Sequence, residues 1–212
     1  MPNPQTAPYG SWSSPITSDL IVASTIGLSG ILLDGAEVYW LESRPQGNGR
    51  SVIVRRAADG TSADVTPPVP RAGEATFSVR TRVHEYGGGS YLVSDGVVYF
   101  CNDADQRLYR QELGGKPGAI TPDPVRPRGL RYADGAMDAR RGRMIWVRED
   151  HTTATPEPVN TLVEIPLDGS QPQRVLQEGR DFYAAPRLSP DGSQLAWLEW
   201  SHPSMPWIGC EL

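Results

Sequence analysis

The residues best suited to chemistry lie in the stretch RVHEYGGGSY, from Arg82 to Tyr91. This stretch contains His84, one of only 3 histidines in the chain, followed by Glu85 and the glycine run 87–89. A histidine beside a carboxylate could transfer protons, and a glycine run beside a strand could cradle a phosphate group. The sequence therefore raises two chemical hypotheses for this stretch, besides a structural role for its glycines.

The residues that follow argue against both chemical hypotheses. The continuation SYLVSDGVVYF is typical of a strand, a turn and a second strand, whereas a phosphate cradle needs a helix directly after the glycines. Glycines in a strand more often mark a bulge or a close approach of two backbones. If the stretch is an inner strand, His84 and Glu85 point to opposite faces and do not pair. We therefore predict no catalytic residue here. His84 and Glu85 remain candidate substrate contacts, with a structural histidine or a solvated strand end as the competing interpretation.

Two other groups of residues could bind a metal or form a disulfide. Glu149, Asp150 and His151 are contiguous and lack the i, i+4 helical spacing that places two ligands on one face. A polar loop at a strand end explains them better, so neither a metal site nor a cofactor is predicted. Cys101 and Cys210, the only cysteines, lie in unrelated contexts and are too few for a zinc site. We interpret both as small buried apolar residues.

The elements that must position these residues are short β-strands. Asp-Gly, a dipeptide that supplies the positive φ of tight hairpin turns, occurs six times. A repeat of about 40–50 residues with four short strands is the sequence signature of a β-propeller blade. Four runs rich in β-branched and aromatic residues start 46 to 60 residues apart and share an apolar-apolar-aromatic core: Val38-Tyr39-Trp40, Val98-Tyr99-Phe100, Met144-Ile145-Trp146 and Leu195-Ala196-Trp197.

These strands are apolar at nearly every position, as expected of blades that are covered on both faces. A β-sandwich, the alternative fold, would show cleaner alternation and more closely spaced turn signals. The predicted fold is all-β, a partial β-propeller of about three and a half four-stranded blades. After an N-terminal extension, 1–18, we expect blades at 19–67, 81–123, 130–179 and 181–212. Because propellers typically close with about 4–8 blades, we expect the chain to be the front part of a longer protein.

Composition restricts the partners of the protein. The formal net charge of −5 and the pI near 5.2 argue against nucleic acid, because no basic stripe is present to neutralise phosphates. No window has the roughly 18 uncharged apolar residues that span a bilayer. The N-terminus, MPNPQTAPYGSW, lacks the basic start and apolar core of a signal peptide. We therefore expect a cytoplasmic protein without a membrane partner, while the oligomeric state does not follow from the sequence.

Four motifs occur in a familiar order: YGSWSSPITSDLI, TRVHEYGGGSY, VREDH followed by EPVNTLVEI, and DFYAAPRLSPDGSQLAWLEWSHPSMPW. Together they resemble the N-terminal propeller of the S9 (prolyl oligopeptidase) family of serine peptidases, in particular the acylaminoacyl-peptidase or dipeptidyl-aminopeptidase-like enzymes. The similarity runs from Tyr9 to Leu212. It departs from the family pattern in WSHPSMPWIGCEL, where Ser201, Ile208 and Cys210 replace two aspartates and a threonine.

The resemblance implies a two-domain hydrolase, in which the propeller screens peptides by size and an α/β-hydrolase domain carries Ser, Asp and His. An α/β-hydrolase nucleophile lies in G-x-S-x-G, and this chain has no such pentapeptide, since GGGSYL has Leu92 at the final position. We therefore expect the chain to be inactive alone and to meet peptide substrates through a catalytic domain that it lacks. The alternatives are a propeller scaffold that binds a protein partner, or a TolB-like periplasmic module. The lack of a signal peptide argues against the TolB-like module.

Overall fold

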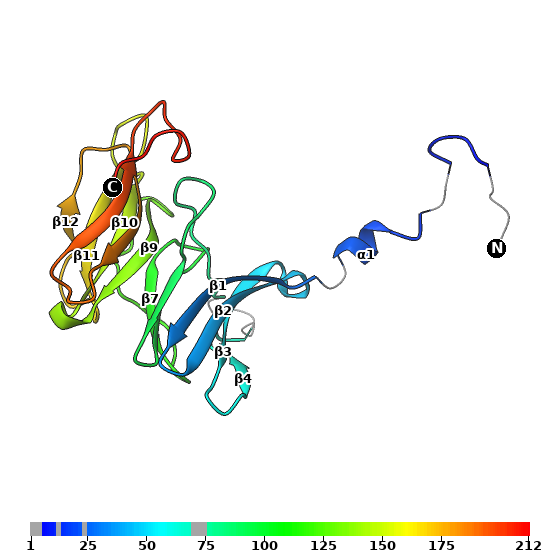
Figure 1. The fold of residues 1–212 in the computed structure, drawn as a ribbon, viewed down its shortest axis with the longest axis horizontal. Helices are drawn as coiled ribbons and strands as arrows, with labels where there is room; N and C mark the ends of the chain where they lie inside the picture. The colour runs from blue at the N-terminus through cyan, green and yellow to red at the C-terminus, as the bar shows by residue number, and fades with distance from the viewer. Residues whose placement is uncertain (1–5, 12–13, 23–24, 69–75) are drawn as a thin grey trace.

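The computed structural model describes residues 6–11, 14–22, 25–68 and 76–212. Parts of the expected N-terminal extension and first blade, namely residues 1–5, 12–13 and 23–24, lie outside the described residues. The described N-terminal residues, which include the short helix α1 (Ser18–Val22), extend away from the body of the protein (Figure 1). No helix in the described part of the chain is long and apolar enough to cross a membrane.

Four antiparallel sheets make up the body of the protein. Within each sheet, strands that follow one another along the chain are neighbours, as hairpin turns require. The first sheet contains β1 (Gly27–Asp34), β2 (Glu37–Arg44), β3 (Arg50–Arg56) and β4 (Ser62–Asp64). The second contains β5 (Tyr91–Ser94), β6 (Val97–Cys101), β7 (Leu108–Glu112) and β8 (Gly118–Ala119). The third contains β9 (Leu130–Asp138), β10 (Arg143–Asp150), β11 (Val159–Pro166) and β12 (Arg174–Gln177), and the fourth β13 (Phe182–Leu188) and β14 (Leu195–Trp200).

The first strands of successive sheets lie against one another, because β1 contacts β5, β5 contacts β9, and β9 contacts β13. The four sheets therefore stand side by side in chain order, from blue to red in Figure 1, and the described sheets do not close into a ring. This arrangement confirms the predicted partial β-propeller. Beyond β14, backbone hydrogen bonds between Glu199 and Glu211 pair the end of the chain with that strand.

The repeated apolar-apolar-aromatic cores all lie in the second strand of a sheet, namely β2, β6, β10 and β14. The core residues of β6 and β10 are buried, which confirms the predicted covering of these two strands on both faces. Those of β14 are only partly buried or exposed, because no further described sheet packs against its far side. The same sequence pattern thus reaches different degrees of burial according to its position in the row of sheets.

Apolar side chains fill the spaces between neighbouring sheets. Tyr39 and Phe100 belong to the cluster between the first and second sheets, and Val147 and Tyr183 to the one between the third and fourth. The cluster between the second and third sheets contains Trp146, the largest fully buried side chain among the described residues. Because each cluster draws on two sheets, packing between blades holds the fold together.

The first strand of three sheets contains a bulge with one residue at positive φ: Gly30 in β1, Asp134 in β9 and Ala185 in β13, at 60°, 53° and 50°. The Asp134-Gly135 dipeptide therefore lies in a bulge and not in a hairpin turn. A bulge inserts one extra residue into a strand and uses the same positive φ as a turn, so the dipeptide suits either. The Asp134 carboxylate accepts hydrogen bonds from the backbone N–H groups of Gly89 at 2.6 Å and Ala185 at 3.1 Å. This bulge therefore connects three blades near their inner strands.

The two cysteines differ in their surroundings. Cys101 is fully buried, as predicted, and burial raises the pKa of its thiol to about 12. A thiol with so high a pKa is inert near neutral pH. Cys210 is exposed, so the prediction that it is buried is wrong. It lies after β14, where no described sheet covers the chain.

Candidate functional site

The His84-Glu85 pair lies in a turn that precedes β5, and the prediction of an inner strand is wrong at this point. Both residues have positive φ, 55° and 64°. The turn is closed by hydrogen bonds from the N–H of Glu85 to the carbonyl of Arg82 at 3.0 Å and from the N–H of Gly87 to that of Val83 at 2.8 Å. Consecutive non-glycine residues in this region are strained, so surrounding contacts must hold the turn. We call residues 83–87 the HEY turn.

The glycine run after the turn is needed for close packing. A Cβ on Gly88 would lie 2.9 Å from Oδ1 of Asp134 and 3.2 Å from Cβ of Ala133, both in β9. A Cβ on Gly89 would lie 3.1 Å from the same Asp134 oxygen. The predicted close approach at the glycines is therefore confirmed, although the glycines lie before β5 rather than within a strand.

The imidazole of His84 connects the HEY turn to the fourth sheet. Its Nε2 lies 3.1 Å from the carbonyl oxygen of Tyr183 in β13, so Nε2 carries the hydrogen that is donated. The ring centroid lies 5.4 Å from that of Phe182, 5.6 Å from that of Trp200 and 5.6 Å from that of Tyr86. The ring is only half-buried, and its contacts are those of a side chain that joins two blades.

Glu85 points elsewhere and is held by an arginine. Its side chain is 80% exposed, and Oε1 lies 2.7 Å from Nη1 of Arg131 at the start of β9. This hydrogen bond holds the pKa of the Glu85 carboxyl below its ordinary value, so the group is ionised at neutral pH. His84 and Glu85 thus contact different partners, as predicted. The reason is that the turn directs their side chains apart, and not that they lie on opposite faces of a strand. An ionised, exposed carboxylate can accept hydrogen bonds from a cationic ligand.

A buried carboxylate connects the HEY turn to the third sheet. Glu149 in β10 is 3% exposed, and Oε1 accepts a hydrogen bond from the backbone N–H of His84 at 3.0 Å. Its Oε2 accepts from Nη1 of Arg131 at 3.2 Å and lies 2.7 Å from Nε2 of His151. The prediction of a polar loop at 149–151 is therefore wrong for Glu149 and Asp150, because both belong to β10, and Glu149 also faces inward. We call Glu85, Arg131, Glu149 and His151 the arginine–carboxylate network.

Sequence reasoning did not identify Arg131 or the link from His84 to Glu149. Glu85 and Arg131 are 46 residues apart, and His84 and Glu149 are 65 apart. They meet because the loop before β5, the start of β9 and the end of β10 lie at the same edge of adjacent sheets. The spacing of residues along the chain does not predict such a contact. It would follow only from knowing how the strands of neighbouring blades are aligned. No described group of three or more His, Cys, Asp and Glu side chains is arranged to hold a metal ion.

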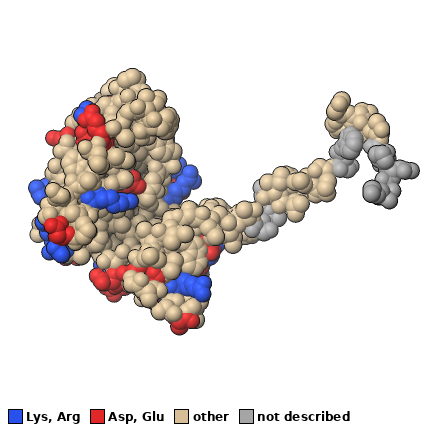
Figure 2. Space-filling view, viewed as in Figure 1, with Lys and Arg blue, Asp and Glu red and all other residues tan. Residues whose placement is uncertain are grey.

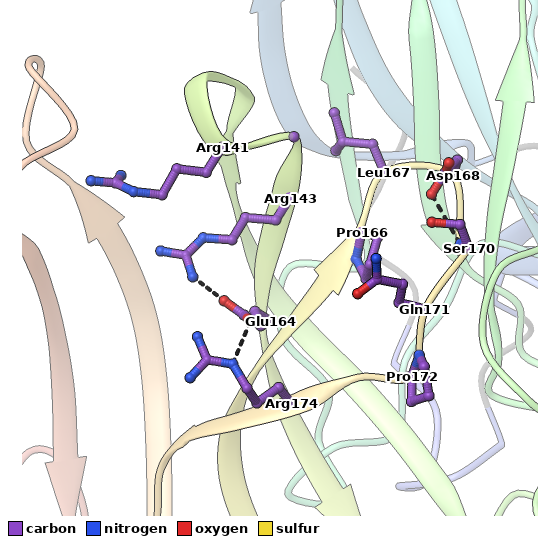
Figure 3. A pocket seen from close by; sticks show the side chains of 11 residues that line it. Arg141, Arg143, Glu164, Pro166, Leu167, Asp168, Ser170, Gln171, Pro172 and Arg174 are labelled. Atoms are coloured by element: carbon purple, nitrogen blue, oxygen red, sulfur yellow. Dashed lines mark hydrogen bonds and ion pairs between the residues drawn. The ribbon is translucent and has the colours of Figure 1, made fainter.

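A cavity of about 630 Å³ lies at the opposite end of the third sheet, where β10 begins and β11 ends. Figure 3 shows Glu164 between Arg143 and Arg174, with which it forms ion pairs. The Asp138 carboxylate also pairs with Arg143, at 2.8 Å. Acidic and basic side chains lie close together elsewhere on the body as well (Figure 2). Because these charges neutralise one another, this cavity offers a charged ligand fewer free partners than the exposed Glu85 carboxylate in the HEY turn.

Comparison with known proteins identifies related chains. No protein-family model and no curated protein matches the chain. A solved structure of a puromycin-hydrolyzing peptidase from Mycobacterium tuberculosis is 40% identical, with a TM-score of 0.83 over 97% of this chain. A solved puromycin hydrolase is 38% identical, with the same TM-score and coverage. This chain spans 32% of the length of each.

More distant solved structures share the fold alone. A structure from a study of two prolyl endopeptidases is 15% identical with a TM-score of 0.58, and TolB from Acinetobacter baumannii is 12% identical with a TM-score of 0.56. The two relatives near 40% identity cover 97% of the chain. The chain therefore belongs to the S9, or prolyl oligopeptidase-like, family of peptidases, as a homologue of their propeller portion.

Proposed function

We propose that this chain is part of the propeller of a serine peptidase that hydrolyses short peptides, and that the propeller screens the substrates. The observation that carries this proposal is the 40% identity to a puromycin-hydrolyzing peptidase over 97% of the chain. Hydrolysis in this proposal belongs to a Ser-Asp-His triad in a C-terminal domain outside the chain. The proposed blades cover residues 19–67, 81–123, 130–179 and 181–212 and follow an extension at 1–18.

The geometry of the HEY turn supports a contact with substrate there. The Glu85 carboxylate is exposed and is fixed by Arg131, so it is oriented before a ligand arrives. Its chemical complement is a cation, and the free amino terminus of a peptide is the cation that every unblocked peptide carries. Tyr86, next in the chain, is 66% exposed, and its ring lies 5.6 Å from that of His84, so it offers an exposed aromatic surface in the same turn. In this proposal His84 holds the turn in place, and Glu85 makes the contact.

The first experiment tests where hydrolysis resides. The purified chain is incubated with chromogenic aminoacyl and peptidyl substrates, with and without a serine-directed covalent inhibitor. We expect no turnover above the uncatalysed rate, because the chain contains no G-x-S-x-G nucleophile motif. Turnover that the inhibitor abolishes would show that the chain carries its own catalytic serine and would contradict the proposal.

The second experiment tests the contact at Glu85. We expect Glu85→Gln to weaken the binding of a short peptide with a free amino terminus about fivefold, or about 1 kcal/mol, because the ion pair is exposed. Binding of the N-acetylated peptide should not change. Glu112→Gln is the matched control, because Glu112 is also exposed and also pairs with an arginine, Arg110, at 2.9 Å. Titration followed by NMR measures both affinities, and equal effects of the two substitutions would refute the contact.

A further inference from the structure

A small cavity beside the arginine–carboxylate network has a lining unlike that of the cavity around Glu164. Its volume is about 240 Å³, and it lies between the turn at 126–129 and the loop at 151–158. Among the described residues no Asp or Glu side chain lines it. The polar and charged residues of the lining are Arg126, Arg128, Arg131, His151, Thr153 and Thr155. A cavity lined by cationic and hydroxyl groups suits an anion.

Arg126 and Arg128 are fixed by backbone carbonyls and not by carboxylates. Nη1 of Arg126 donates to the carbonyl of His151 at 3.1 Å, and Nε of Arg128 donates to that of Ala104 at 2.9 Å. In the described part of the chain neither arginine forms an ion pair. A guanidinium group has five N–H donors, so one bond to a carbonyl orients the group and leaves other donors for a ligand. Both positive charges therefore remain uncompensated.

The other two basic residues of the lining, Arg131 and His151, already contact carboxylates. Nη1 of Arg131 contacts Glu85 and Glu149, and Nε2 of His151 contacts Glu149. Nε of Arg131 is buried and has no partner among the described residues. Arg131 thus joins the cavity to the HEY turn, and the net positive charge of the cavity comes from Arg126 and Arg128.

The turn that carries these two arginines is closed by a backbone hydrogen bond and is tightly packed at Gly129. The N–H of Gly129 donates to the carbonyl of Arg126 at 2.9 Å, and Arg128 adopts the left-handed region with φ of 58°. A Cβ at Gly129 would lie 2.8 Å from Cγ2 of Thr152 and 2.9 Å from the carbonyl oxygen of Arg126, so only glycine fits there. A strained non-glycine residue beside an obligatory glycine points to a function for the side chain at that residue.

We infer that this cavity binds a small oxyanion, a carboxylate or a phosphate, through the guanidinium groups of Arg126 and Arg128. Arginine forms paired hydrogen bonds with the two oxygens of either group, which lysine or histidine does not. The two threonines add hydroxyl donors at the same cavity. This site stands apart from the contact proposed at Glu85, since the two share only Arg131.

The test is titration of the chain with inorganic phosphate, and with an N-acetylated dipeptide that ends in either a free carboxylate or an amide. We expect the chain to bind phosphate or the free acid saturably. We expect Arg126→Gln and Arg128→Gln each to weaken that binding about tenfold, because each substitution removes one charge-assisted pair of hydrogen bonds. Binding of phosphate alone would indicate a phosphate site. Binding of the free acid but not of the amide would indicate a peptide carboxylate.

Arg187→Gln is the matched control, because Arg187 is exposed, donates to the carbonyl of Pro186 and has no ion-pair partner in the described part of the chain. Urea midpoints equal to that of the unmodified chain show that each variant folds. Lack of saturable binding of every anion would overturn the inference, as would an equal loss in Arg187→Gln. Glu85→Gln should not weaken anion binding, so failure at the HEY turn and failure at this cavity are distinguishable.

Discussion

Replacement of Glu149 by alanine is expected to destabilise the protein by about 3 kcal/mol, because it removes the buried carboxylate that both Arg131 and the backbone N–H of His84 contact. Glu149 is 3% exposed and accepts hydrogen bonds from Arg131 and from the backbone of His84. Arg131 keeps its contact with Glu85, so the loss falls at the lower end of the range for buried pairs. Urea unfolding followed by tryptophan fluorescence measures the free energy of unfolding.

The same substitution should release the HEY turn, since the N–H of His84 loses its acceptor. Amide hydrogen exchange at His84 should be faster in Glu149→Ala than in the unmodified chain. The increase should exceed the increase that the lower free energy of global unfolding would cause by itself. Glu112→Ala is the control, because an exposed ion pair contributes only about 0–1 kcal/mol. If Glu149→Ala were as stable as Glu112→Ala, the arginine–carboxylate network would not support the fold, and the strained turn would need another explanation.

Replacement of Trp146 by alanine is expected to cost about 3–5 kcal/mol, because it opens a cavity between the second and third sheets. The side chain is fully buried and packs in a cluster with Tyr99, Tyr132 and Met144. Trp207→Ala, at an indole that is 76% exposed, should change the free energy of unfolding by no more than about 0.5 kcal/mol. Urea unfolding of both variants provides the measurement. Equal effects would show that the interface between these sheets does not hold the fold together.

A double substitution tests the geometry of this interface more closely. A Cβ at Gly135 would lie 2.6 Å from Cε2 and 2.7 Å from Cζ2 of Trp146, so Gly135→Ala should destabilise by about 1–3 kcal/mol through overpacking. Phenylalanine has no atom in place of Cζ2, so Trp146→Phe makes room for the added methyl group. The cost of Gly135→Ala should therefore be smaller in the Trp146→Phe background. Strict additivity of the two effects would contradict this packing.

The sequence alone predicted the strands, the partial propeller and the family. These properties depend on local patterns, such as Val98-Tyr99-Phe100 after an Asp-Gly turn, whose apolar side chains need burial in any environment. It also predicted that the glycines at 88 and 89 mark a close approach, since only a missing side chain makes such contact possible. Where a dipeptide suits two backbone conformations, as Asp134-Gly135 does, the local pattern did not distinguish a turn from a bulge.

The tertiary structure decided what the chemically promising residues contact. RVHEYGGGSY contains a strained turn, which is held because Glu149, 65 residues from His84 in the chain, accepts the backbone N–H of His84, and because the imidazole of His84 reaches a carbonyl in the fourth sheet. Arg131 orients Glu85 only because adjacent sheets place their loops at the same edge, and the turn that carries Arg126 and Arg128 lines a cavity because the loop at 151–158 lies beside it. Contacts between blades depend on how the sheets stack, and the sequence around each residue does not predict which residue of the neighbouring blade it contacts.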